Sequence, residues 1–166
     1  MKSASFTFKL ASPSPKDPLS IFHVAQGFFL AGQRCLLEIR VGPSQTQYLP
    51  GAGVANLCFA IELFLKSLIV LLGKESPKTH KLVELIGLLP TGELDPIRAA
   101  YGQQVQQPPL DDLLAEVSQF FVKLRYEFEH DIFSLNEHPV YVLADILYQH
   151  CAARNNNQGS VKGVSA

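Results

Sequence analysis

The run KLRYEFEH, residues 123–130, places a guanidinium, a carboxylate and an imidazole close together near the end of an expected helix. Arg125 and His130 are five positions apart, and Glu129 directly precedes the histidine. A guanidinium can hold a phosphate through parallel hydrogen bonds, and an imidazole can exchange a proton near neutral pH. Together, these groups have the chemistry needed to cleave RNA without a metal ion.

Helical geometry places Arg125 and His130 on different faces. At about 100° per residue, they lie roughly 140° apart around the axis. The face between them mixes polar, apolar and aromatic side chains: Ser118, Val122, Tyr126 and Glu129. Such a mixture on an outward face predicts a contact surface. If a second copy packs there, Arg125 and His130 of both chains converge on one cleft about a two-fold axis.

A structural role for the same two residues is the alternative. An imidazole at a helix C-terminus interacts with the free carbonyls and the helix dipole. Arg125 and Glu129 are spaced to form an ordinary i, i+4 surface ion pair, which contributes little to stability.

Further polar candidates lie in an apolar stretch upstream. Glu62 and Lys66 are four positions apart, so we expect either a structural ion pair or polar residues that line the cleft and contact substrate. His80 follows Thr79 and is expected to cap or pack against a short helix. The other histidines are expected to have no catalytic partner, with His138 and His150 at the surface. We found no metal-ligand spacing and no phosphate-binding glycine motif, so no metal and no cofactor are expected.

Apolar periodicity predicts an all-α fold, a bundle of four to five helices with short connecting helices and no convincing strand. The expected helices cover residues 18–40, 53–72, 81–89, 92–104 and 110–130, and a last one follows Pro139. Residues 1–16 are expected to be extended, residues 17–153 to form the helical domain, and residues 154–166 to be a disordered tail. Residues 90–109 are the least regular connection, and residues 41–53 are expected to be a loop.

The expected helix 53–72 is apolar on two sides. One face carries residues such as Leu57, Ile61 and Leu65, and a second strip carries Phe59, Leu63 and Val70. A helix of this kind is either central in a bundle or covered by another subunit. It is not expected to cross a membrane, because a Glu and a Lys lie near its middle.

Composition limits the possible functions. The chain has 166 residues, is 47% hydrophobic and carries a net charge of −1, so it offers no global attraction for nucleic acid or anionic membranes. Any RNA contact therefore needs a local basic site. The chain has three cysteines, an odd number, and they are far apart in the sequence. This favours reduced thiols in the core and a reducing compartment. The N-terminus lacks the unbroken apolar stretch of a signal peptide, so we expect a cytoplasmic protein.

Three stretches together resemble the HEPN family (higher eukaryotes and prokaryotes nucleotide-binding domains). Residues 61–86 resemble the family's long second helix and the Lys-Thr-His-x-Leu turn after it. The Arg-x4-His run at Arg125 and His130 resembles the family's signature, and an apolar helix follows it. The resemblance covers residues 18–152.

This resemblance implies a helical bundle that forms a homodimer around a shared cleft. It implies an RNA-directed protein and a metal-independent endoribonuclease of a toxin or defence system, with a cognate antitoxin or a nucleotidyltransferase as partner. The alternative is a non-catalytic RNA-binding, nucleotide-binding or protein-interaction scaffold. The chain departs from the family pattern at Tyr126, where a polar residue is usual, and at Ile132, where members paired with a nucleotidyltransferase have tyrosine.

Overall fold

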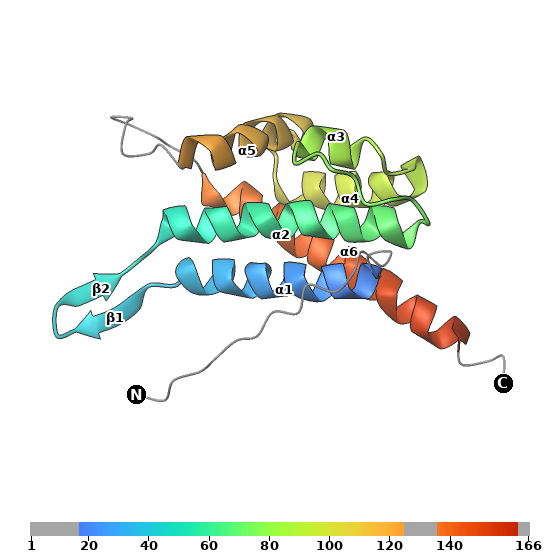
Figure 1. Ribbon diagram of the computed structural model, residues 1–166. Coiled ribbons are helices and arrows are strands. Elements are labelled where there is room, and N and C mark those ends of the chain that lie inside the picture. The colour runs from blue at the N-terminus through green and yellow to red at the C-terminus, as the bar shows by residue number, and fades with distance from the viewer. Residues whose placement is uncertain (1–16, 125–135, 163–166) are drawn as a thin grey trace.

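A computed structural model describes residues 17–124 and 136–162. Within these ranges it contains six helices and one hairpin, which confirms the predicted all-α fold (Figure 1). The elements are α1 (Pro18–Cys35), β1 (Ile39–Gly42), β2 (Gln45–Gln47), α2 (Pro50–Leu71), α3 (Leu82–Ile86), α4 (Thr91–Gln104), α5 (Leu110–Leu124) and α6 (Glu137–Lys162).

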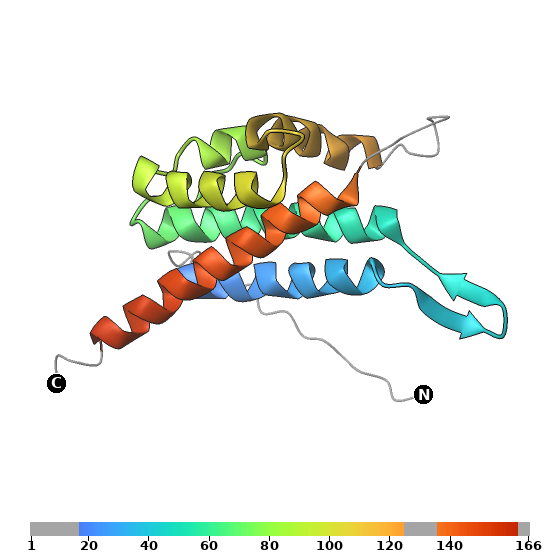
Figure 2. The ribbon, with the colours of Figure 1, turned by 180° about the vertical axis from the view of Figure 1, so that it is seen from behind.

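Helix α2 is the centre of the bundle. It lies beside α1 on one side and α3 and α5 on the other, and α6 crosses behind it (Figures 1 and 2). Its core face is fully buried at Leu57, Ile61 and Leu65, as its apolar periodicity predicts. The helix is long and apolar enough to span a membrane, but 67% of its most apolar stretch is buried inside the protein. The central position explains this hydropathy.

Two glycines let α1 and α2 approach closely. A Cβ atom added to Gly32 of α1 would lie 2.8 Å from Cγ of Leu57, and one added to Gly53 of α2 would lie 2.7 Å from Cδ2 of Leu36. Both distances are shorter than atoms tolerate. The absence of a side chain at these positions therefore sets the spacing of the two helices at the end nearest the hairpin.

An aromatic cluster joins α6 to the α1–α2 pair. The ring centroids of Phe29 and Tyr148 are 5.2 Å apart, and those of Phe22 and Phe64 are 5.9 Å apart. Gln26 donates a hydrogen bond to the Tyr148 hydroxyl at 3.1 Å, so the cluster is closed by a polar contact. Rings in such tilted and stacked pairs add to the stabilisation from burial. This cluster fixes where α6 lies against the bundle.

The hairpin corrects the prediction of one helix over residues 18–40 followed by a loop. Helix α1 ends at Cys35, and β1 pairs antiparallel with β2, with Ile39 opposite Gln47. Ile39 and Val41 favour extended backbone because they branch at Cβ, and Gly42-Pro43 favours a turn. The hairpin projects from the bundle (Figure 1). Its apolar residues are exposed, and their spacing in the sequence resembled that of a helix.

Helix α6 corrects the prediction of a disordered tail from residue 154, since it continues to Lys162. Its extension is supported by side-chain contacts beyond the apolar face. The Arg154 guanidinium pairs with Glu93 of α4, and Asn155 donates to the carbonyl of Cys151 at 2.8 Å. The sequence from residue 154 is polar, so apolar periodicity could not reveal these contacts.

Cys58 and Cys151 are buried, as expected of core thiols, and Cys35 is half-buried. Burial raises the pKa of the Cys58 thiol to about 12, because a thiolate there would lose its water. Burial and the Glu93 carboxylate also raise the pKa of Cys151. Both thiols therefore stay protonated near neutral pH and are poor nucleophiles.

Candidate functional site

The predicted catalytic pair, Arg125 and His130, lies outside the described residues, as do Tyr126 and Glu129. These residues fall between the last residue of α5, Leu124, and the first of α6, Glu137. Within residues 17–124 and 136–162, the groups with chemical potential are two polar clusters and two pockets.

Glu62 and Lys66 form a buried ion pair on α2. The Lys66 ammonium donates to Oε1 of Glu62 at 2.9 Å, and the two side chains are only 10% and 11% exposed. The predicted i, i+4 ion pair is thus confirmed. Two charges this far from water are held only because each neutralises the other.

His80 is the third member of this group, which we name the α2 polar group: Glu62, Lys66 and His80. Its Nδ1 lies 2.9 Å from the same Oε1 of Glu62, while its side chain is 79% exposed. The expected role in capping or packing α3 is therefore wrong. The carboxylate contacts one ring nitrogen, and most of the imidazole is open to solvent.

The turn that carries His80 is held by its neighbours. Thr79 donates to Glu84 at 2.7 Å and accepts from the Lys81 amide at 3.2 Å. The Thr79 hydrogen bond, together with the Lys81 ammonium, lowers the pKa of the Glu84 carboxyl. The same Glu84 contact raises the pKa of Lys81. The turn is therefore a compact polar structure that fixes the histidine beside α2.

This turn is also attached to α5, the helix that leads into residues 125–135. The amide of Leu82 donates to Oγ of Ser118 at 3.0 Å, and Ser118 donates to the Leu114 carbonyl at 2.6 Å. Ser118 was expected on the outward contact face, and it instead links α5 to α3. Hydrogen bonds thus connect the turn that carries His80 to α5.

A second polar cluster joins α4 to α6. The buried carboxylate of Glu93 accepts from Arg154 and lies 2.7 Å from Nε2 of His150. His150 was expected at the surface, but its side chain is only 21% exposed. Sequence reasoning missed this cluster because its members are 57 and 61 residues apart. It joins the first turn of α4 to α6.

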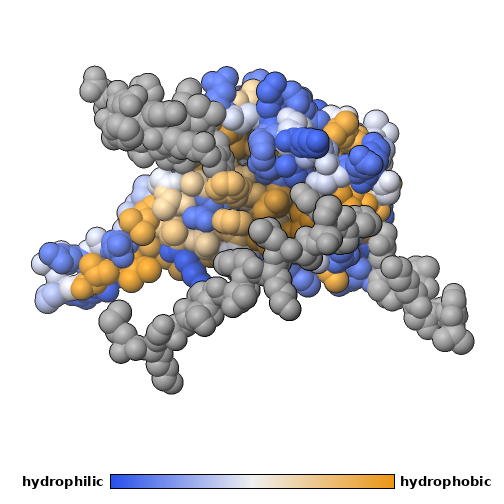
Figure 3. Space-filling view, in the orientation of Figure 1, coloured by the Kyte–Doolittle hydropathy of each residue, from blue (hydrophilic) through white to orange (hydrophobic). Residues whose placement is uncertain are grey.

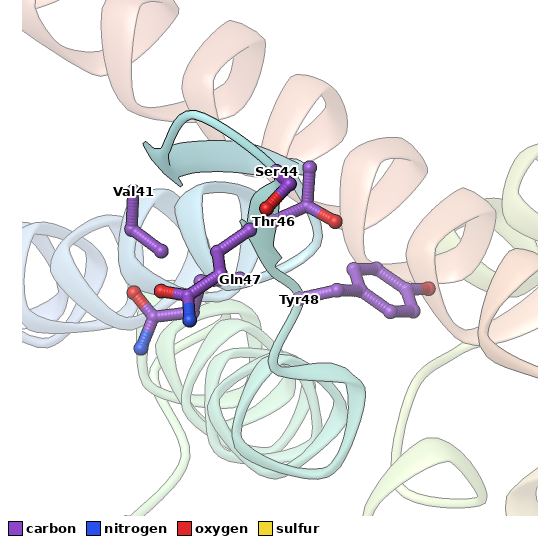
Figure 4. Close-up of a pocket in the computed structure, with 6 residues that line it drawn as sticks. Val41, Ser44, Thr46, Gln47 and Tyr48 are labelled. Carbon is purple, nitrogen blue, oxygen red and sulfur yellow. The ribbon is translucent and has the colours of Figure 1, made fainter.

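A pocket of about 530 Å³ opens at the start of α6. It is lined from the end of α1, from the segment before α2 and from the first turns of α6. Tyr48 donates to Glu137 at 2.5 Å, and Gln33 donates to the Tyr141 hydroxyl at 3.0 Å. A neighbouring pocket beside the hairpin is lined by Val41 and residues 44–48 (Figure 4). Tyr48 lines both pockets, and its ring extends towards α6 (Figure 4).

Residues 17–124 and 136–162 contain no group of three or more His, Cys, Asp and Glu side chains able to hold a metal ion. Two clusters in these ranges combine a carboxylate, a histidine and a cation: the α2 polar group and the Glu93 cluster. Both are carboxylate–histidine arrangements with a cation, which suit proton transfer and anion contacts better than metal ligation.

The HEPN domain model matches residues 55–138, which is half of the 166-residue chain. The chain belongs to the HEPN domain family. The match begins in α2, passes through the Glu62, Lys66 and His80 positions and includes the Arg-x4-His run before α6. No curated protein and no solved structure matches the chain. Membership in the HEPN family indicates an RNA-related or nuclease-like function.

Proposed function

We propose that this HEPN protein is a metal-independent endoribonuclease. The observation that carries the proposal is the family match over residues 55–138, because it spans both the α2 polar group and the Arg-x4-His signature. Arg125 and His130 are the proposed catalytic residues. Tyr126 and Glu129 are proposed to contact the substrate.

The proposed reaction is an internal transfer within RNA. The 2′-hydroxyl attacks the adjacent phosphorus while His130 of one subunit accepts its proton. The bond to the 5′-oxygen breaks, solvent water supplies that oxygen with a proton, and Arg125 stabilises the charge on the phosphorane-like transition state. The products are a 2′,3′-cyclic phosphate and a 5′-hydroxyl. DNA resists cleavage because it lacks the attacking hydroxyl.

The α2 polar group supports the proposed site. The ion pair buries the charges of Glu62 and Lys66, so His80 is the member that solvent and substrate can reach. We propose that Glu62 and Lys66 act on substrate through His80, which is a positioning role. The link from Leu82 to Ser118 would transmit that position to α5.

A homodimer is part of the proposal, since a shared cleft needs two signatures. The strip predicted on α2 remains partly open, with Phe59 37% exposed and stacked on Phe28 of α1 at 5.2 Å. Figure 3 shows hydrophobic residues gathered over the α1–α2 face. Exposed apolar side chains on two adjacent helices support contact with a second subunit.

The proposed setting is a cytoplasmic toxin or defence system, with a cognate antitoxin as a partner. A nucleotidyltransferase antitoxin is a weaker proposal, because Ile132 stands where a tyrosine accompanies that partner. Expression should arrest bacterial growth, and His130→Ala should relieve the arrest.

The direct test is cleavage of a panel of RNAs by the purified wild-type protein with EDTA present. Arg125→Ala and His130→Ala should each reduce the rate by at least about 100-fold, the contribution of one acid–base or oxyanion group. His23→Ala and Arg98→Ala are the matched controls, because both side chains are exposed and lie outside the proposed site. Intact RNA in every reaction would overturn the proposal.

A second candidate is a non-catalytic RNA-binding or scaffolding module. Tyr126 favours it, because a polar residue is usual directly after the signature arginine in family nucleases. Binding of RNA with no cleavage by the wild type would support this candidate instead of the nuclease.

A further inference from the structure

The pocket at the start of α6 lies beside the proposed signature in the chain. Two of its lining residues, Glu137 and His138, follow His130 by seven and eight positions. Its volume, about 530 Å³, lies in the range of small-ligand sites. The cavity therefore has a suitable size for the base of one nucleotide.

The polar lining of the pocket includes a carboxylate and a side-chain amide, and both carry acceptor oxygens. Oε1 of Glu137 accepts the Tyr48 hydroxyl, which orients the carboxylate and raises the pKa of Tyr48. Among the described residues, no hydrogen bond uses Oε2 of Glu137 or Oε1 of Gln33, because Gln33 is held through its nitrogen by Tyr141. A ligand that presents N–H donors would satisfy these oxygens.

The apolar part of the lining is aromatic and aliphatic. Tyr48 and Tyr141 both line the pocket, one from the segment before α2 and one from α6. Leu36 adds an aliphatic side chain at the end of α1. Unstacked RNA bases bind on aromatic side chains of this kind and are read along their Watson–Crick edges.

The order of donors distinguishes the four bases. Guanine presents N1–H and the N2 amino group side by side, which suits a carboxylate and a neighbouring amide oxygen. Its O6 and N7 acceptors are available to an imidazole N–H, and the exposed ring of His138 supplies one. Uracil places carbonyls on both sides of its single N–H, and adenine and cytosine have one amino group next to a ring acceptor. These three bases would bring lone pairs against Glu137.

We propose that this pocket binds a guanine base of the RNA and selects guanine near the cleavage site. The inference rests on the proposed function for its substrate. It assigns Glu137 and Gln33 as base-reading residues and Tyr48 as the residue that positions the Glu137 carboxylate.

The test measures binding of four trinucleotides with 2′-O-methyl sugars, UGU, UAU, UCU and UUU, to the full chain by calorimetry. The methyl groups block the attacking oxygen, so binding is measured without cleavage. The UGU trinucleotide should bind at least about tenfold more tightly than each of the others, as expected for a hydrogen bond to a charged group. Equal affinities for all four would overturn the proposal.

Variants identify the pocket as the source of any preference. Glu137→Gln replaces one carboxylate oxygen with an NH2 group and removes the charge, so it should abolish the guanine preference. Tyr48→Phe keeps the ring but loses the hydroxyl that orients Glu137, so it should weaken the guanine preference several-fold. Glu75→Gln is the matched control, since this exposed glutamate follows the opposite end of α2. Circular dichroism checks that each variant is folded. A preference that survives Glu137→Gln would place base reading elsewhere and overturn the assignment.

The two proposals fail separately. Guanine-selective binding without RNA cleavage would remove the nuclease and keep the pocket. Cleavage with no preference for guanine, together with equal trinucleotide affinities, would remove the pocket and keep the nuclease.

Discussion

At the scale of single residues, the buried ion pair of Glu62 and Lys66 is sensitive to the loss of one partner. Lys66→Met leaves the Glu62 carboxylate with His80 alone in a site that excludes most water. The free energy of unfolding should fall by about 3 kcal/mol, measured by urea denaturation. Lys81→Met is the control, because the exposed Lys81–Glu84 pair contributes at most about 1 kcal/mol. Equal losses in the two variants would contradict burial of the pair.

The buried thiols predict how stability depends on alkaline pH. The folded-state pKa of Cys58 is raised from 9.0 to about 12, so its contribution to stability is present below pH 9 and is lost as pH rises. Above pH 9 the unfolded thiol ionises while the folded one stays protonated. The free energy of unfolding should then fall by about 1.4 kcal/mol per pH unit from this residue. Cys58→Ala should flatten the curve, and an unchanged slope would contradict the raised pKa.

Residue spacing decided which polar contacts were predictable. The pairing of Glu62 with Lys66 followed from an i, i+4 spacing on one helix. The contacts of His80 and of Glu93 did not, because they join different elements and depend on how the helices pack. Local periodicity carries no information on such partners.

At the scale of elements, the α1–α2 contact predicts opposite effects for two glycines on the same helix. Gly32→Ala should destabilise the protein by about 1 kcal/mol or more, because overpacking against Leu57 exceeds the gain in helix propensity. Gly27→Ala should stabilise it by up to about 1 kcal/mol, since a Cβ there meets open space. Thermal unfolding of both variants checks this, and a stabilising Gly32→Ala would refute the close approach.

The elements also show where sequence reasoning reached its limit. The ranges of α2 and α4 followed the predictions closely, because apolar periodicity marks α2 and flanking prolines mark α4. The hairpin was missed since β2 is three polar residues and gains its pairing only from β1. The catalytic pair is proposed from spacing and family resemblance, and it lies outside the described residues.

At the scale of the whole molecule, the shared cleft predicts complementation between inactive subunits. A mixture of Arg125→Ala and His130→Ala proteins, unfolded together and refolded, forms heterodimers. Each heterodimer keeps one arginine and one histidine from different chains, so RNA cleavage should return to a sizeable fraction of the wild-type rate. Separately refolded variants are the control. No recovery, with heterodimers confirmed by mass, would mean that each chain holds a complete site or none.

The central claim is that Arg125 and His130 drive attack by a ribose hydroxyl without a metal. The most direct measurement uses one RNA oligonucleotide and its version with a single 2′-deoxyribose at the cleaved position, both incubated with wild-type protein in EDTA. We predict cleavage of the RNA to a 2′,3′-cyclic phosphate, no cleavage at the deoxy position, and loss of both products with His130→Ala. Cleavage that continues at the deoxy position, or that survives His130→Ala unchanged, would contradict the account.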